Sequence, residues 1–215
     1  TGKLQPQYAL GNYNRPVSLG ELSSENVVGC LRNMVAVASN ISKMAFEAYE
    51  PSELQFIRDQ RNELSEVFSH MHYVDSEDEN SRRAASNTRL VALGSKLNSQ
   101  RLLNAIYYAP QHNMEISGHS LGELIEMAFA DKMMEGVIYE EDAEYGRIVI
   151  TGTGESWFTG PQPALHIDLG GDDFYTYTEG GGASLDTPVG VIIDLGGNDA
   201  YESTTPFCQG SGSMG

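Results

Sequence analysis

The chain has 215 residues, enough for one domain with a substantial core or for two small ones. Lys and Arg total 13 against 30 Asp and Glu, a formal net charge of −17 at pH 7. This charge disfavours a nucleic-acid or anionic lipid partner and favours cations and basic partners, and no apolar run reaches the roughly 20 residues of a membrane-spanning helix.

The N-terminal part of the sequence predicts helices. Apolar residues recur at alternating steps of four and three from Val27 to Ala45, which draws one continuous stripe on a helix. Pro51 is expected to close this helix, and Gly94 divides a later region into about two further helices. We therefore predict a helical domain, arranged as a small bundle, over residues 1–144.

The segment GHSLGE at 118–123 contains G-x-S-x-G, the pattern of a nucleophile elbow. It resembles the active-site serine segment of the malonyl-CoA acyltransferase family. That resemblance implies a serine-dependent hydrolase or acyltransferase with Ser120 as nucleophile, for which His166 is a candidate base. The same Ser120-x-x-Glu123 is also a capping box, and the preceding segment is too short and polar for the buried strand of an elbow. We expect the helix cap and keep the enzyme as the alternative.

From residue 145 onward the sequence is rich in Gly, Asp, Thr and β-branched residues, and it repeats itself. IDLGGDDFY at 167–175 returns as IDLGGNDAY at 193–201, seven identities in nine positions at a spacing of 26. A divergent copy, IVITGTGESWF, lies at 148–158. Fixed-period similarity is typical of stacked units that bury their apolar faces on one another.

These features predict an α+β protein in which residues 145–215 begin a Gly/Asp-rich β-solenoid, similar to a parallel β-helix, with a repeat of about 26 residues. The sequence ends part-way through the next period. A solenoid that stopped there would expose a sheet edge. We therefore expect a fragment of a larger chain, or an assembly subunit whose partner supplies the remaining coils.

The repeats resemble the DLGGDD-x-Y repeats of large secreted bacterial proteins and, more distantly, calcium-binding β-roll (RTX-type) repeats. If equivalent positions stack about 4.8 Å apart, acids lie on acids and repel by roughly 1 kcal/mol even in water. Calcium would relieve this repulsion because it accepts carboxylate and carbonyl oxygens in flexible geometry. The expected calcium ligands are Asp168, Asp172, Asp173, Asp194, Asn198 and Asp199.

A simpler alternative needs no metal. Asp173 and Asp199 would cap turns through hydrogen bonds, while Tyr175 and Tyr201 stack as a ladder. The lone tryptophan, Trp157, fills the aromatic position of the divergent copy. We expect it to cover the open end of the solenoid, with a carbohydrate-stacking surface as the alternative.

The cysteines and two histidines leave alternatives open. Cys30 and Cys208 fit either two separate thiols or one long-range disulfide, and His70 and His72 fit surface positions better than a metal site. Taken together, the sequence predicts an extracellular, cell-surface or periplasmic bacterial repeat protein. Its role would be structural or one of interaction, with calcium as a stabiliser and a protein partner or further coils as its contacts.

Overall fold

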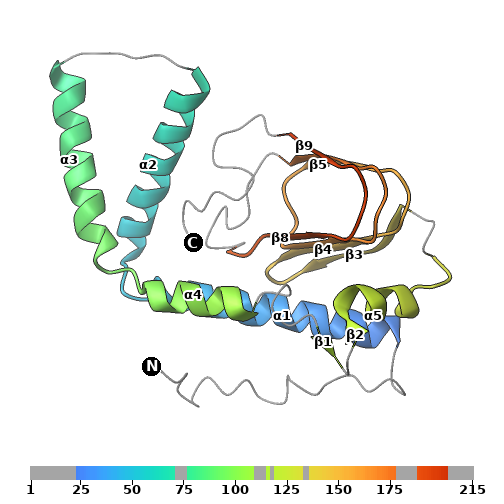
Figure 1. The fold of residues 1–215 in the computed structure, drawn as a ribbon. Coiled ribbons are helices and arrows are strands. Elements are labelled where there is room, and N and C mark those ends of the chain that lie inside the picture. The colour runs from blue at the N-terminus through green and yellow to red at the C-terminus, as the bar shows by residue number, and fades with distance from the viewer. Residues whose placement is uncertain are drawn as a thin grey trace.

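The computed structural model describes residues 23–70, 77–108, 115–116, 119–132, 136–177 and 188–202. Helices occupy the N-terminal part and two larger β-sheets follow, so the expected α+β class is confirmed (Figure 1). In the described ranges, no helix has the length and apolar character to cross a bilayer.

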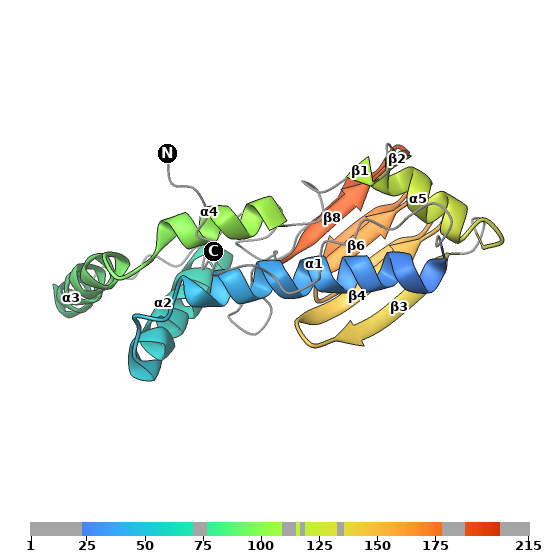
Figure 2. The ribbon, with the colours of Figure 1, turned by 90° about the horizontal axis from the view of Figure 1, so that it is seen from below.

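Helix α1 (Ser24–Met44) supplies the helical side of the core. Its N-cap is Ser23, whose hydroxyl accepts a hydrogen bond from the Asn26 N–H at 3.2 Å. The helix lies across the strands of the larger sheet (Figure 2). Of the expected stripe, Val27, Leu31, Ala38 and Ala45 are buried, whereas Met34 and Ile41 are only partly buried; Val28 and Val35 beside it are buried as well.

Helices α2 (Pro51–His70) and α3 (Glu77–Gly94) form an arm that leaves the rest of the molecule (Figure 1). Pro51 does not end α1, which stops at Met44. It begins α2 instead, because a proline at the first helical position gives up an N–H that has no partner there anyway. Helix α4 (Ser99–Tyr108) returns to pack along α1. The helices therefore do not gather around one shared core as a compact bundle.

Two sheets are built from strands that alternate between them along the chain. The four-stranded sheet has the order β3-β4-β6-β8 and the three-stranded sheet the order β5-β7-β9. Only β3 and β4 pair in antiparallel fashion; the other neighbours in these two sheets are parallel. The strands are β3 (Val137–Ala143), β4 (Gly146–Thr151), β5 (Trp157–Gly160), β6 (Leu165–Asp168), β7 (Phe174–Tyr177), β8 (Val191–Asp194) and β9 (Ala200–Tyr201).

We call β4–β5, β6–β7 and β8–β9 repeat units 1, 2 and 3. The register aligns Asp168 with Asp194, so units 2 and 3 are offset by the expected 26 residues. It aligns Thr151 with Asp168, so units 1 and 2 are offset by only 17. The period is not constant because the connection from β7 to β8 is longer than the one from β5 to β6. The sheet region also begins with β3, ahead of the expected boundary at 145.

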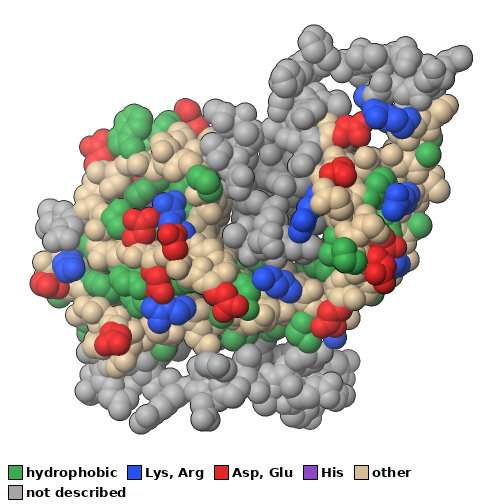
Figure 3. Space-filling model, turned by 180° about the vertical axis from the view of Figure 1, so that it is seen from behind, with side chains coloured by type: hydrophobic (Ala, Val, Ile, Leu, Met, Phe, Trp, Pro, Cys, Tyr) green, Lys and Arg blue, Asp and Glu red, His purple; other side chains and the backbone are tan. Residues whose placement is uncertain are grey.

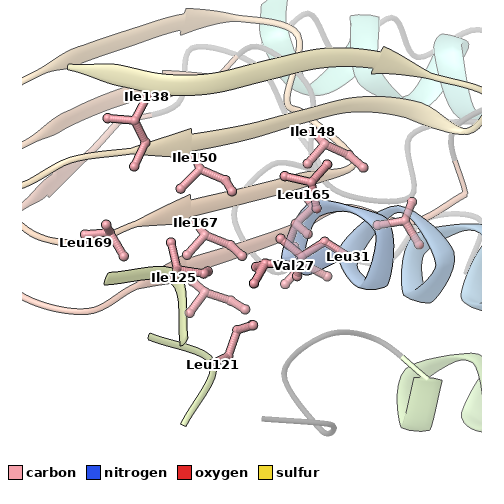
Figure 4. Packing of buried hydrophobic residues seen from close by; sticks show 14 of the residues in the cluster. Val27, Leu31, Leu121, Ile125, Ile138, Ile148, Ile150, Leu165, Ile167 and Leu169 are labelled. Atoms are coloured by element: carbon pink, nitrogen blue, oxygen red, sulfur yellow. The ribbon is translucent and has the colours of Figure 1, made fainter. Parts of the chain in front are cut away.

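The main apolar core lies between the four-stranded sheet, α1 and α5 (Leu121–Ala128), which follows a short antiparallel pair of β1 (Glu115–Ile116) and β2 (His119–Ser120) (Figure 4). The opposite face of this sheet is covered by the three-stranded sheet. Parallel strands are usually covered on both faces in this way. Residues that fill the core include Leu121, Ile125, Ile148, Ile150, Leu165, Ile167, Val191 and Ile193.

Candidate functional site

The space between the two sheets is filled by polar and aromatic side chains. His166 on β6 is fully buried, with Nε2 at 3.0 Å from Thr151 Oγ1 and Nδ1 at 2.9 Å from Tyr177 Oη. The Phe158 ring meets the imidazole edge-on, with 4.4 Å between ring centroids. Burial, with the Arg147 charge as a further cause, lowers the pKa of His166 to about 3. His166 is therefore a neutral, hydrogen-bonded link between the sheets.

Asp168 and Asp194 tie the sheets together at the ends of β6 and β8. Oδ1 of each accepts the backbone N–H two residues later, at 3.0 and 3.2 Å. Oδ2 of each accepts the hydroxyl of the tyrosine seven residues later, Tyr175 at 2.7 Å and Tyr201 at 2.5 Å. The D-L-G-G-x-D-x-Y sequence thus forms the same turn and the same cross-sheet bond twice.

Asp173 and Asp199 reach back to the preceding repeat unit, a contact that we call the aspartate ladder. Asp199 Oδ1 accepts the backbone N–H of Asp173 at 2.8 Å, and Asp173 Oδ1 accepts that of Ser156 at 2.6 Å. Ser156 is the unit 1 counterpart of these aspartates. One carboxylate in each of units 2 and 3 therefore fastens that unit to the backbone of the unit before it.

The aromatic rings stack along the same direction. Tyr175 and Tyr201 are nearly parallel, with centroids 4.6 Å apart and planes at 5°, and Phe158 stacks on Tyr175 at 5.0 Å. The expected tyrosine ladder is confirmed. The expected turn caps were assigned to the wrong aspartates: Asp168 and Asp194 accept the N–H two residues later, whereas Asp173 and Asp199 bond to the preceding unit.

Asp173 has the most perturbed carboxyl group of the described residues. Its side chain is 3% exposed, and its Oδ2 has no hydrogen-bond partner within the described part of the chain. Burial, followed by repulsion from Asp168, raises the pKa of Asp173 to about 7. Burial also raises the pKa of Asp194, and the neighbouring Asp199 raises it further. This arrangement favours a proton or a cation at the Asp168–Asp173 carboxyl pair.

The six expected calcium ligands meet in pairs. Asp168 lies against Asp173, Asp194 lies against Asp199, and Asp172 Oδ1 accepts the Asn198 N–H at 2.9 Å. Across the ranges that the structure describes, no three His, Cys, Asp or Glu side chains converge on one point. Because calcium takes roughly six to eight oxygen ligands, a carboxyl pair would need further ligands such as backbone carbonyl oxygens or water.

Ser120 is the N-cap of α5, and its capping box with Glu123 is confirmed. Ser120 Oγ accepts the Glu123 N–H at 3.3 Å, and Glu123 Oε2 accepts the Ser120 N–H at 2.7 Å. Helix α5 packs on the apolar face of the four-stranded sheet, whereas His166 points from the other face toward the three-stranded sheet. The sheet separates the two residues, so the proposed nucleophile and base do not form a pair.

Trp157 does not cover an end of the sheets. Its side chain is 69% exposed, and its ring lies against Phe174 with centroids 4.8 Å apart. Cys30 is half-buried in α1, while Cys208 and the side chains of His70 and His72 lie outside the described residues.

Sequence reasoning missed Tyr177, Thr151 and Ser156 as members of the interior network. For Thr151 and Ser156 the signal was the alignment of the divergent copy with unit 2, which places them at the positions of Asp168 and Asp173. Tyr177 had no such signal, because its unit 1 counterpart is Gly160. His166 was considered only as a catalytic base. Its true partners depend on two sheets facing each other, which a strand pattern does not encode.

Comparisons with protein-family models, curated proteins and solved structures found nothing that matches this chain.

Proposed function

We propose that residues 137–202 are the first coils of an acidic β-solenoid in a secreted or cell-surface structural protein, which serves as a scaffold for further coils or a protein partner. The aspartate ladder carries this proposal. Each of Asp173 and Asp199 accepts an N–H from the equivalent position one unit earlier. Such a contact can recur without limit, as in repeat proteins whose units contact only their neighbours.

The outer side of unit 3 supports the same interpretation. Leu195 and Tyr201 are 40% and 43% exposed, whereas their unit 2 counterparts Leu169 and Tyr175 are 6% and 1% exposed. Within the described residues, no strand pairs with β8 or β9 on the side away from unit 2. A further coil would cover Leu195 and Tyr201 as unit 3 covers the equivalent residues of unit 2.

The charge of the chain agrees with an extracellular scaffold. The net charge is −17, and only four of the 215 residues are lysine. Figure 3 shows acidic side chains both over the body that holds the sheets and over the helical arm. Such a surface keeps a protein soluble and favours contact with cations and basic partners.

Calcium is a second element of the proposal, which the chemistry of unit 2 supports. Asp173 Oδ2 is buried without a described partner. The Gly154 carbonyl oxygen and Asp173 Oδ2 lie 2.8 and 3.0 Å from the position that a Cβ on Gly171 would take. Carboxylate and carbonyl oxygens around a glycine are ligands that calcium accepts. A bound proton on the Asp168–Asp173 pair would satisfy the same atoms without a metal.

The scaffold proposal is tested by adding one coil. Residues 177–202 span one period and can be duplicated directly after Glu202. The added unit should raise the melting temperature, because a coil docked on unit 3 buries Leu195 and Tyr201. Hydrogen exchange should show new protection of β8 and β9. An added segment that exchanges as an unfolded tail, with an unchanged melting temperature, would contradict the solenoid.

The calcium element is tested separately, by melting the protein with calcium, with magnesium and with a chelator at constant ionic strength. A selective rise of several degrees with calcium is expected if the folded state binds it. Asp173→Asn should abolish that rise, and Asp142→Asn on β3, an exposed acid outside the expected ligand set, serves as the matched control. The absence of a calcium effect would mean that the carboxyl pair holds a proton instead of a metal ion. It would not affect the scaffold proposal.

A further inference from the structure

The outer face of the three-stranded sheet presents side chains in three rows. The parallel register places Trp157 beside Phe174 and Phe174 beside Ala200, which makes an aromatic row. A second row lies two positions earlier in each unit and a third row two positions later. The second row is Glu155, Asp172 and Asn198, two acids and an amide that are all exposed, and the third row is Thr159, Thr176 and Glu202. None of the nine is a lysine or arginine.

This sheet also has an open edge at β5. In the four-stranded sheet the edge of β4 is covered by β3, but within the described residues no strand lies at the corresponding edge of β5. The Phe174 N–H donates to the Ser156 carbonyl oxygen at 2.9 Å, so alternate backbone groups of β5 face β7. The intervening groups, those of Trp157 and Thr159, face the open edge. An extended segment could add to the sheet there.

The charges near this edge favour a positively charged partner. Glu155, two residues before Trp157, and Trp157 itself are both exposed, and the chain as a whole carries a net charge of −17. Arg147 donates to the Pro161 carbonyl oxygen just after β5, but its charge is paired with Glu140 at 3.0 Å. A tryptophan face attracts Arg and Lys side chains more strongly than the other aromatic residues do. A carboxylate two residues away would pair with the same cation or with the next one along an extended strand.

We propose that the edge of β5 binds an extended, basic peptide segment of a partner protein, which adds a strand beside β5 and places Arg or Lys side chains on Trp157 and Glu155. Strand addition of this kind obtains affinity from main-chain hydrogen bonds and specificity from alternate side chains. The inference goes beyond the scaffold role by naming a partner class and a binding edge. The inference rests on the scaffold role only because it requires that the repeat units are folded.

The test uses the full chain and a fluorescently labelled synthetic peptide in which arginine alternates with threonine. Binding is measured by the anisotropy of the label, and the emission of Trp157, the only tryptophan in the chain, reports contact at the site. We expect saturable binding that weakens as salt is raised, since exposed charges are screened. A glutamate–threonine peptide and an arginine peptide interrupted by proline should not bind, because they lack the charge or the strand.

Variants locate the site. Trp157→Ala should weaken binding about two- to fivefold or more, the range expected for loss of an exposed cation–π contact. Glu155→Gln should weaken it and flatten the salt dependence, while Glu126→Gln on α5, an acid that is also exposed, should change neither. Thr159→Pro should prevent strand addition by removing an N–H from the open edge. The melting temperature of each variant verifies that the sheets remain folded.

The outcomes against the proposal are specific. Equal binding of the glutamate peptide, or unchanged affinity in folded Trp157→Ala or Thr159→Pro, would overturn it. A neutral oligosaccharide that alters Trp157 emission where the arginine peptide does not would assign the aromatic row to sugar stacking instead. The coil-duplication experiment reports on the scaffold independently, so a failure of one proposal is distinguishable from a failure of the other.

Discussion

Ser120 shows how one residue fits two interpretations that differ in their consequences. As an N-cap, its hydroxyl satisfies the Glu123 N–H, a bond whose loss costs about 1 kcal/mol. Ser120→Ala should therefore lower the free energy of unfolding by about that amount in urea titrations. Ser120→Thr, which keeps a hydroxyl cap, should restore most of it. A folded Ser120→Ala protein with undiminished stability would contradict the capping role.

Asp173 gives the chain a dependence of stability on pH. The pKa of its buried carboxyl is raised from 3.8 to about 7, so the folded state holds a proton that the unfolded chain releases at lower pH. The stabilisation of the folded state by this proton is complete below pH 3.8 and is lost as pH rises through about 7. Asp173→Asn keeps an acceptor for the Ser156 N–H and replaces the proton by an amide donor. We expect the variant to gain stability over the wild type as pH rises from 4 toward 8.

The measurement is the difference in unfolding free energy between wild type and Asp173→Asn across that pH range. His166 acts in the opposite sense, because its pKa is lowered from 6.5 to about 3 and its neutral form is the folded one. Its contribution to stability therefore increases as pH rises between those values. It is common to both proteins and cancels in the difference. A difference that stays flat with pH would mean that Asp173 titrates normally.

The turns that join the strands depend on glycines that neighbouring units touch. Gly197 has φ of +145°, and a Cβ there would lie 1.6 Å from the Gly171 carbonyl oxygen. Gly197→Ala should therefore destabilise unit 3 by more than the roughly 1–3 kcal/mol of a strained backbone alone. Gly196→Ala is the matched control, since nothing lies within 4 Å of its Cβ position. Hydrogen exchange of β8 and β9 should rise in the first variant and not in the second.

The elements also show which parts of the fold a sequence can predict. The stripe of α1 and the alignment of Asp168 with Asp194 were predictable, because burial period and near-identical repeats are local properties. The offset of 17 for unit 1 was missed, because the repeat of 26 was taken as fixed whereas the connection after β5 is shorter than the one after β7. The exposure of Trp157 was missed because an edge strand and a central strand have the same pattern.

At the scale of the whole molecule, the helices divide into those that share the core with the sheets and those that do not. Ile125 of α5 is fully buried in that core. Ile125→Ala should therefore lower the free energy of unfolding by about 2–5 kcal/mol, and the helices and sheets should melt together at a lower temperature. Among the described elements, the main packing partner of α2 is α3, and neither helix packs against the sheets. The base of the α2–α3 arm is held by contacts such as Arg89 over the Phe56 ring at 4.0 Å and the Lys96–Glu53 ion pair at 2.6 Å.

Replacing residues 58–87 with a short Gly/Ser linker would remove the arm beyond the Phe56–Arg89 contact. We expect the melting temperature, followed by Trp157 emission, to stay within a few degrees of the wild type, because the core between α1, α5 and the four-stranded sheet is untouched. Far-UV circular dichroism should lose the helical signal of the arm alone. If the truncated chain instead melts as early as Ile125→Ala, the arm stabilises the sheets and the two regions form one cooperative unit.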